Sequence, residues 1–143
     1  MTDAPDGRLS ALARQGRALA ERVPEPAALA RVGLGATVLL AGAHKLVAPG
    51  AWAVYVVGWL EPFLVVSPRT FMLANGLPEV LVGGLLLADR LTAPAAAVVA
   101  VSLAGTVAYL GLAALTTGGF VDTLVRDVGL LGLALVVLVE AAR

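Results

Sequence analysis

Four long apolar stretches follow one another along the chain, separated by shorter segments that are polar or rich in aromatic residues. They cover residues 29–47, 71–89, 92–115 and about 122–140. An α-helix needs about 20 apolar residues to cross a hydrocarbon core of about 30 Å, so each stretch is long enough to span a membrane. The pattern therefore predicts an all-α, polytopic membrane protein built as a four-helix transmembrane bundle.

The segment 48–66, between the first and second stretches, is also apolar but has a different composition. It contains Pro49-Gly50, Trp52, Tyr55, Trp59 and Glu61-Pro62. Because Trp and Tyr concentrate where a bilayer meets water, we expect an interfacial or re-entrant segment here. A full fifth span is the alternative, and the positive-inside rule does not decide between them, since both arrangements leave seven of the ten Lys and Arg inside.

Residues 1–26 are polar, and we assign them to a cytoplasmic, arginine-rich N-terminal segment that precedes a membrane domain at 27–143. Residues 8–23 read RLSALARQGRALAERV, with leucines and valine spaced between arginines at positions 8, 14, 17 and 22. This spacing suits an amphipathic helix on an anionic membrane surface. A solvated, disordered tail is the equal alternative. With four spans, both termini are expected on the cytoplasmic side of the cell membrane.

The first apolar stretch has a second interpretation as a cleaved signal peptide. Ala41-Gly42-Ala43 follows its apolar centre and matches an A-x-A cleavage site. The leader would be unusually long for that role, however, and the rest of the chain is equally typical of a membrane protein. We therefore favour a retained span.

The composition supports a bilayer as the environment of the chain. Hydrophobic residues make up 59% and charged residues 14%, against about 45–50% and about 25% in typical soluble domains. A soluble fold of 143 residues could not bury this much apolar surface. The formal net charge is zero, so the chain offers no overall basic field and nucleic acid is not an expected partner.

Cysteine is absent and His44 is the only histidine. Iron–sulfur clusters held by thiolates, cysteine-ligated zinc and a haem held by two histidines of one chain are therefore excluded. We predict no metal site and no covalently bound cofactor. A redox role would need a diffusible cofactor such as a quinone, or a cofactor carried by a partner subunit.

Glu79 stands directly after Pro78, near the middle of an apolar stretch. At 1.5 Å per residue it would lie about 12–15 Å from each membrane interface. An ionised carboxylate at that depth costs about 2.5–3.5 kcal/mol on insertion scales, so it must pair, reach water or remain protonated. Glu79 is therefore either the acceptor of a functional polar pocket or one half of a buried contact that fixes the register of the bundle.

Other polar residues are expected near Glu79 in the outer half of the bundle. The candidate polar or quinone site comprises Glu79, Asn75, Lys45, Tyr109 and Arg126. Asn75 lies one helical turn before Glu79, while the other three come from the remaining spans. No catalytic residue is assigned among them.

Three further polar positions favour structural roles. We expect Arg31 to be an anchor at the inner interface and His44 to be interfacial. Arg126-Asp127 is expected to be a local charge pair.

The third apolar stretch contains alanines four residues apart, at Ala96, Ala100, Ala104 and Ala108. In a helix they form one slowly drifting face. Small residues let helices approach closely in lipid, where no hydrophobic force drives them together. We therefore predict a helix-packing face here.

Several short patterns resemble the DoxX family of small integral membrane proteins. The resemblance extends over residues 31–140 and consists of RVGLG at 31–35, AGAHKL at 41–46, GLPE at 76–79 with GGLLL at 83–87, Arg90, and RDVGLLGLAL at 126–135. It implies a four-helix membrane protein. Family members include a membrane subunit of a thiosulfate:quinone oxidoreductase, and the family offers no agreed catalytic set to transfer.

Two functions of different classes follow as hypotheses. The first is a quinone-associated subunit of a membrane oxidoreductase complex, in which Glu79 handles protons and a partner redox subunit supplies electrons. The second is a non-enzymatic assembly protein that binds a partner, or a second copy of itself, through the alanine face or the N-terminal segment. A proton-coupled transporter is disfavoured, because the sequence has no inverted repeats.

Overall fold

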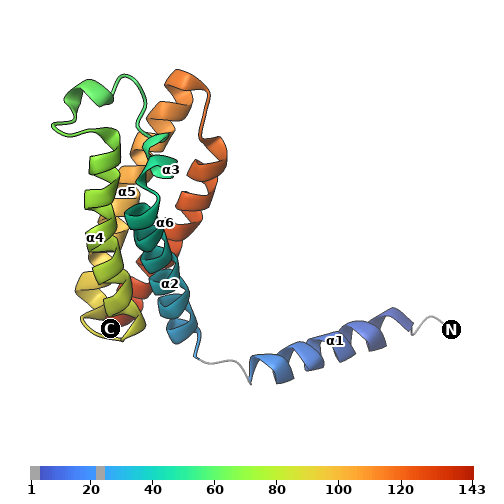
Figure 1. Cartoon of the computed structure of the whole chain (residues 1–143). Coiled ribbons are helices and arrows are strands. Elements are labelled where there is room, and N and C mark those ends of the chain that lie inside the picture. Colours follow the sequence, from blue (N-terminus) through green and yellow to red (C-terminus); the bar gives the residue numbers. More distant parts are fainter. Residues whose placement is uncertain (1–3, 22–24) are drawn as a thin grey trace.

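The computed structural model describes residues 4–21 and 25–143, and in these residues the fold is all-α (Figure 1). The four long helices that pack together are α2 (Pro26–Val47), α4 (Pro68–Leu87), α5 (Thr92–Thr117) and α6 (Val121–Ala141). The remaining elements are α1 (Ala4–Ala20), α3 (Pro49–Ala53) and the 3-10 helix η1 (Glu61–Phe63). The expected all-α class is confirmed.

Proline marks the start of several helices. Pro26, Pro49 and Pro68 stand in the first turns of α2, α3 and α4. A proline is favourable there, because the first backbone N–H groups of a helix have no partner within it. At α4 the hydroxyl of Ser67 also accepts a hydrogen bond of 3.3 Å from the Thr70 backbone N–H, which caps the helix.

Three of the long helices, α2, α4 and α5, are long and apolar enough to cross a membrane. The fourth, α6, is 21 residues long but carries four charged side chains, at positions 122, 126, 127 and 140. The part of the chain that the structure describes thus contains three candidate spans and has the character of a helical membrane protein. A fourth crossing by α6 stays a prediction.

The segment between α2 and α4 does not form a fifth span. It consists of the five-residue α3, turns and the three-residue η1. A five-residue helix is only about 8 Å long, too short to cross about 30 Å of hydrocarbon. Figure 1 shows that the segment leaves α2 and returns to α4 at the same end of the molecule. The physical reason lies in its prolines and glycines, which interrupt helix formation.

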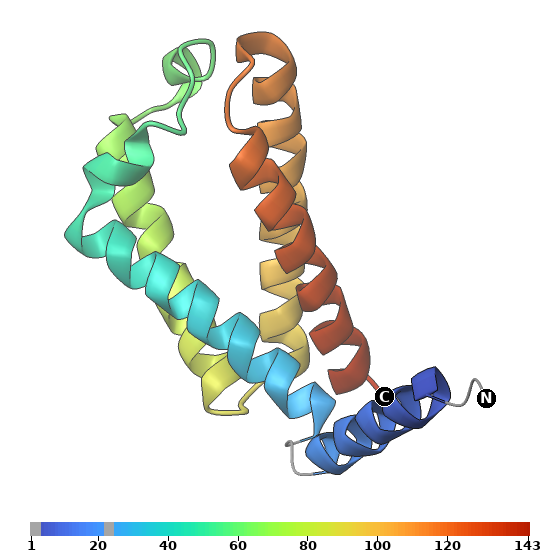
Figure 2. The same cartoon turned by 90° about the vertical axis from the view of Figure 1, so that its right-hand side faces the viewer.

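The long helices form two antiparallel pairs, α2 with α4 and α5 with α6. Figure 2 shows that the pairs meet where α2 begins and α6 ends, and diverge toward the opposite end. We call these the closed end and the open end of the molecule. The α2–α3–α4 segment and the α5–α6 turn both lie at the open end (Figure 1).

Glycines bring α2 and α4 into backbone contact. Gly35 lies against Gly83, and Gly42 against Gly76. A Cβ atom at Gly83 would stand 2.5 Å from the Leu39 backbone nitrogen and 2.8 Å from the Gly35 carbonyl oxygen. Since no side chain fits there, the α2–α4 contact depends on two glycines seven residues apart in each helix.

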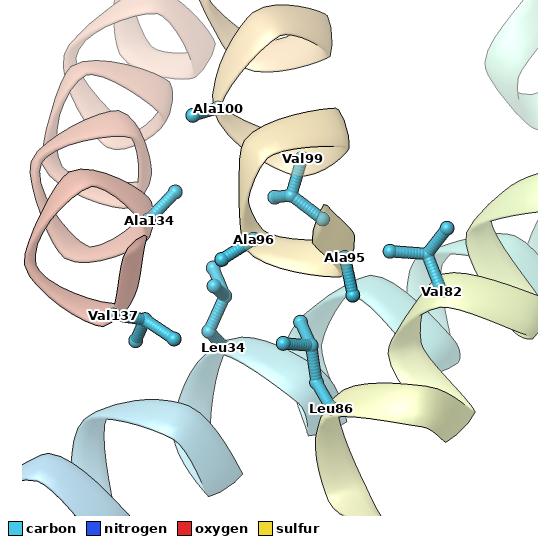
Figure 3. Packing of buried hydrophobic residues seen from close by; sticks show 9 residues of the cluster. All are labelled: Leu34, Val82, Leu86, Ala95, Ala96, Val99, Ala100, Ala134 and Val137. Atoms are coloured by element: carbon cyan, nitrogen blue, oxygen red, sulfur yellow. The ribbon is translucent and has the colours of Figure 1, made fainter. Parts of the chain in front are cut away.

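The buried core gathers at the closed end (Figure 3). It consists of Leu34 from α2, Val82 and Leu86 from α4, Ala95, Ala96, Val99 and Ala100 from α5, and Ala134 and Val137 from α6. All four long helices contribute to it, so this cluster joins the two pairs. Because α2 supplies Leu34, which is fully buried, α2 is an integral part of the packed unit, which favours a retained span.

Arg31 ties the end of α4 to α2 at the closed end. Its guanidinium donates to the carbonyl oxygens of Leu86 and Leu87, the latter at 3.3 Å, and its Nε lies 3.3 Å from Asp89 Oδ1. The last carbonyls of a helix have no partner within it, so this arginine satisfies them. Arg31 was expected only as an interfacial anchor, and the structure gives it this second contact.

The predicted alanine face is packed over only half of its length. Ala96 is 0% and Ala100 5% exposed, both within the core, whereas Ala104 and Ala108 are exposed. Steps of four residues drift by about 40° each around a helix. The face therefore turns away from the core while the two pairs also diverge. Within the chain, Ala96 and Ala100 form the packed part of this face, and packing at Ala104 and Ala108 stays a prediction.

Candidate functional site

A cavity of about 580 Å³ lies between the two helix pairs. All five residues of the predicted polar site line it: Lys45 from α2, Asn75 and Glu79 from α4, Tyr109 from α5 and Arg126 from α6. Trp52 and Tyr55 contribute from the segment between α2 and α4, and the remaining lining is largely apolar. The structure thus brings the candidates together; whether they bind a ligand stays a prediction.

Lys45 and Glu79 form an ion pair across the α2–α4 contact. The side chains are 11% and 25% exposed. The glycine contact positions them, because a Cβ atom at Gly42 would stand 2.8 Å from the Glu79 Cβ. The Lys45 ammonium also lies 4.6 Å from the centre of the Trp52 ring, within the range of a cation–π interaction.

Glu79 keeps one carboxylate oxygen without a protein partner. Oε1 accepts the hydrogen bond from Lys45, whereas Oε2 is buried and unpaired, the only such side-chain oxygen or nitrogen in the described part of the chain. An unpaired buried acceptor typically costs about 1–3 kcal/mol. A hydrogen-bond donor that reaches Oε2, after a small movement of the side chain, would therefore be bound favourably.

Asn75 is attached to its own helix. Its side-chain nitrogen donates to the Phe71 carbonyl oxygen at 2.9 Å, one turn earlier. This bond orients the amide and leaves the side-chain oxygen as the group that can accept from a ligand. Asn75 can therefore offer the cavity its side-chain oxygen as an acceptor and its second amide N–H as a donor.

The hydroxyl of Tyr109 holds the connecting segment in place. It donates to the Tyr55 carbonyl oxygen and accepts from the Val57 backbone N–H at 3.1 Å. From the sequence, Tyr109 is a member of the candidate polar or quinone site. Because its single proton is already used, Tyr109 acts first as a positioning residue for the wall of the cavity.

The segment between α2 and α4, which carries Trp52, Tyr55 and Trp59, forms side-chain contacts with both helix pairs at the open end. Trp59 Nε1 donates to Thr116 Oγ1 at 3.2 Å, and the Tyr55 hydroxyl lies 3.4 Å from Thr123 Oγ1. Trp52 Nε1 donates to His44 Nδ1 at 2.9 Å. Trp52 and Tyr55 are not among the site residues predicted from the sequence. Their clustering in one short segment is the signal that could have indicated a cavity wall.

Arg126 and Asp127 form the second charge pair at the cavity, as the sequence predicted. Arg126 Nε lies 2.9 Å from Asp127 Oδ1, and the side chains are 55% and 7% exposed. The four charged residues that line the cavity, Lys45, Glu79, Arg126 and Asp127, therefore balance in two pairs. Such a lining favours a neutral ligand over an anion or a cation.

The residues near the cavity include no constellation suited to a metal ion. Among the described residues, no group of three His, Asp or Glu side chains is close enough together to hold one. Hydrogen bonding, aromatic contact and proton exchange with the two charge pairs are the chemistry that this set of side chains offers.

The fold and site thus define an all-α membrane protein with a polar cavity between helix pairs. The model of the DoxX family matches residues 27–114, which is more than half of the chain, and the protein belongs to the DoxX family. The match covers Lys45, Asn75, Glu79 and Tyr109 and ends before α6. No curated protein and no solved structure matches the chain.

Proposed function

We propose that this DoxX-family protein spans the membrane four times and is the quinone-associated subunit of an oxidoreductase complex. The observation that carries the proposal is the Lys45–Glu79 ion pair, which lines a cavity of about 580 Å³ between apolar helices. Small-molecule pockets are typically about 300–1,000 Å³ in volume. The cavity is therefore large enough for the ring of a lipid-soluble molecule.

The lining supports a neutral, aromatic ligand. Its charges are paired, and the aromatic side chains of Trp52 and Tyr55 line it together with Glu79 and Asn75. A quinone or its reduced form has an aromatic or quinonoid ring, polar oxygens and solubility in lipid. These properties match the cavity better than those of a small anion.

Glu79 is the residue that we assign to proton handling. It is a titratable group away from bulk water, and one of its oxygens lacks a protein partner. Proton-coupled reduction of a quinone needs such a group within hydrogen-bond reach. Electrons would come from a partner subunit, since the chain contains no cysteine and only one histidine.

The proposed orientation places the closed end on the cytoplasmic side. The arginine-rich residues before α2 and both termini would then be cytoplasmic, in line with the positive-inside rule. α6 would cross as the fourth span, with Arg126 and Asp127 neutralising each other near its outer end. The cavity would lie in the outer half of the membrane.

The test is co-purification from the native host in mild detergent, followed by mass spectrometry of bound lipids and partner proteins. We expect stoichiometric quinone and a redox-active partner with the wild-type protein, and loss of the quinone in Glu79→Gln. Glu140→Gln is the matched control, because Glu140 pairs with Arg143 on the exposed C-terminal turn. Equal quinone in both variants and the wild type would remove Glu79 from the proposal.

A second candidate function is assembly of a membrane complex without a bound cofactor. It is favoured by one observation, the exposed half of the alanine face at Ala104 and Ala108. Such a strip lets another helix approach closely in lipid. Under this function Ala104→Leu abolishes co-purification of the partner, or self-association, whereas Glu79→Gln leaves it intact. Unchanged assembly in Ala104→Leu would count against it.

A further inference from the structure

The first helix, α1, stands apart from the packed helices. Figure 1 shows it beyond the closed end of the molecule, separated from the four long helices. Its three leucines are all exposed: Leu9 is 66%, Leu12 63% and Leu19 63% exposed. A helix with an uncovered leucine face indicates a surface that covers it.

The leucines share one face of the helix. At about 100° per residue, Leu9, Leu12 and Leu19 fall within about 80° of one another. Gly16 lies within the same face, and Ala18 lies about 180° from Leu9. Arg14 is on the side away from the leucines, and both it and Arg17 are exposed. α1 is therefore amphipathic, and the sequence-based alternative of a structureless tail does not hold for residues 4–20.

The position of α1 along the chain keeps it close to the membrane. Only residues 21–25 separate it from α2, a candidate membrane span. Five residues reach at most about 18 Å when fully extended. The bilayer surface from which α2 enters is therefore within reach of α1 at all times. Arg22 and Val23, which complete the sequence pattern, lie outside the described residues.

The charges of α1 indicate which surface it meets. The helix contains Arg8, Arg14 and Arg17 against the single acid Asp6. A basic helix with an apolar face binds at the headgroup level of an anionic bilayer, where arginines meet lipid phosphates and leucines enter the acyl region. A neutral protein groove would match the leucines but would leave the arginines without partners.

We propose that α1 is an interfacial helix that binds the anionic leaflet next to α2, with Leu9, Leu12 and Leu19 inserted and Arg14 and Arg17 on lipid phosphates. This role is independent of any ligand in the cavity. Binding of the N-terminal segment would then respond to the lipids of this leaflet. The segment is attached to α2, the helix that carries Lys45.

The test uses two single-cysteine variants of the full-length protein, which has no cysteine of its own. Gly16→Cys places a fluorophore in the leucine face, where added side-chain atoms meet nothing within 4 Å. Ala18→Cys places it on the other side of the same helix turn and is the matched control. Each labelled protein is inserted singly into nanodiscs of phosphatidylcholine with phosphatidylglycerol, or of phosphatidylcholine alone.

We expect a blue-shifted emission that nitroxide-labelled lipids quench at position 16, and a water-like emission at position 18. The difference should shrink several-fold in phosphatidylcholine alone and in Arg14→Gln/Arg17→Gln with phosphatidylglycerol present. Equal emission at positions 16 and 18 would overturn the proposal. An unchanged difference without anionic lipid would overturn the role of the arginines, and a water-like label at position 16 in both discs would point to a protein partner instead.

Discussion

At the scale of single residues, the Lys45–Glu79 pair lies beside the Gly42–Gly76 contact of α2 and α4 and lines the cavity between the helix pairs. Each charge makes the other tolerable, and Trp52 covers the ammonium from the open end. Removal of one partner leaves an isolated charge among apolar helices, while removal of both leaves none. The pair can therefore be dissected by a double-mutant cycle.

We expect Lys45→Met and Glu79→Leu each to lower the stability of the detergent-solubilised protein by about 3–5 kcal/mol, the usual effect of breaking a buried ion pair. The double variant should recover most of this loss, because no uncompensated charge remains. Thermal unfolding followed by circular dichroism measures all three. Additive losses in the double variant would show that the two residues do not act as a pair. A stable double variant that lacks bound quinone would in turn separate function from folding.

Tyr109 permits a finer substitution, Tyr109→Phe. It removes one oxygen and leaves the Tyr55 carbonyl and the Val57 amide without their partner. We expect hydrogen exchange at the Val57 amide to accelerate by about 5- to 150-fold, since loss of a buried hydrogen bond amounts to about 1–3 kcal/mol. Tyr55→Phe is the control, because it removes only the 3.4 Å contact with Thr123. Equal protection of Val57 in wild type and Tyr109→Phe would refute the positioning role.

At the scale of helices, adjacent glycines of α4 differ sharply in their surroundings. A Cβ atom at Gly83 would meet the Leu39 backbone at 2.5 Å, whereas one at Gly84 would meet nothing within 4 Å. We expect Gly83→Ala to destabilise the protein by about 1–3 kcal/mol through overpacking. Gly84→Ala should be neutral or slightly stabilising, because alanine favours the helix. Unfolding by titration with a second, denaturing detergent measures the stability of both variants. Equal stability of Gly83→Ala and Gly84→Ala would contradict the close α2–α4 contact.

The sequence predicts where the helices lie along the chain far better than it predicts which helices contact one another. Apolar length alone locates the four long helices, and for the three candidate spans a membrane crossing would impose that length. The partner of α2 could not be derived in the same way. The spacing of the alanines predicts a packing face in α5, yet the closest approach of two helices is made by Gly35, Gly42, Gly76 and Gly83 of α2 and α4. Spacing describes one helix at a time, whereas contact depends on two helices and on the angle between them.

The candidate site, too, can be predicted only in part from the sequence. That Glu79 needs a partner followed from the cost of a charge in lipid, and Lys45 was among the candidates. The commitment of the Tyr109 hydroxyl to the backbone near Tyr55 could not be foreseen, because it depends on the path of an irregular segment. The same holds for Trp52, whose ring lies beside Lys45 because of the path that the chain takes after α2.

At the scale of the whole molecule, the proposed orientation is open to direct measurement. Cysteine substitutions at Gly119, in the α5–α6 turn, and at Arg90, in the α4–α5 turn, mark opposite ends of the molecule. In intact cells we expect a membrane-impermeant maleimide to label position 119, and to label position 90 only after permeabilisation. Labelling of position 90 alone in intact cells would invert the topology. Labelling of both positions in intact cells would place the two ends of α5 on the same side of the membrane, and α5 would then not cross it.

The two helix pairs are also two continuous halves of the chain, residues 26–87 and 92–141, connected by residues 88–91. Each half is a helical hairpin that buries its own contact, and the halves share the closed-end core and the walls of the cavity. A gene cut within 88–91 should therefore yield two fragments that reassemble in the membrane. A molecule bound in the cavity would touch both fragments and would change their affinity for each other. A measurement of this affinity would therefore report that a molecule is bound.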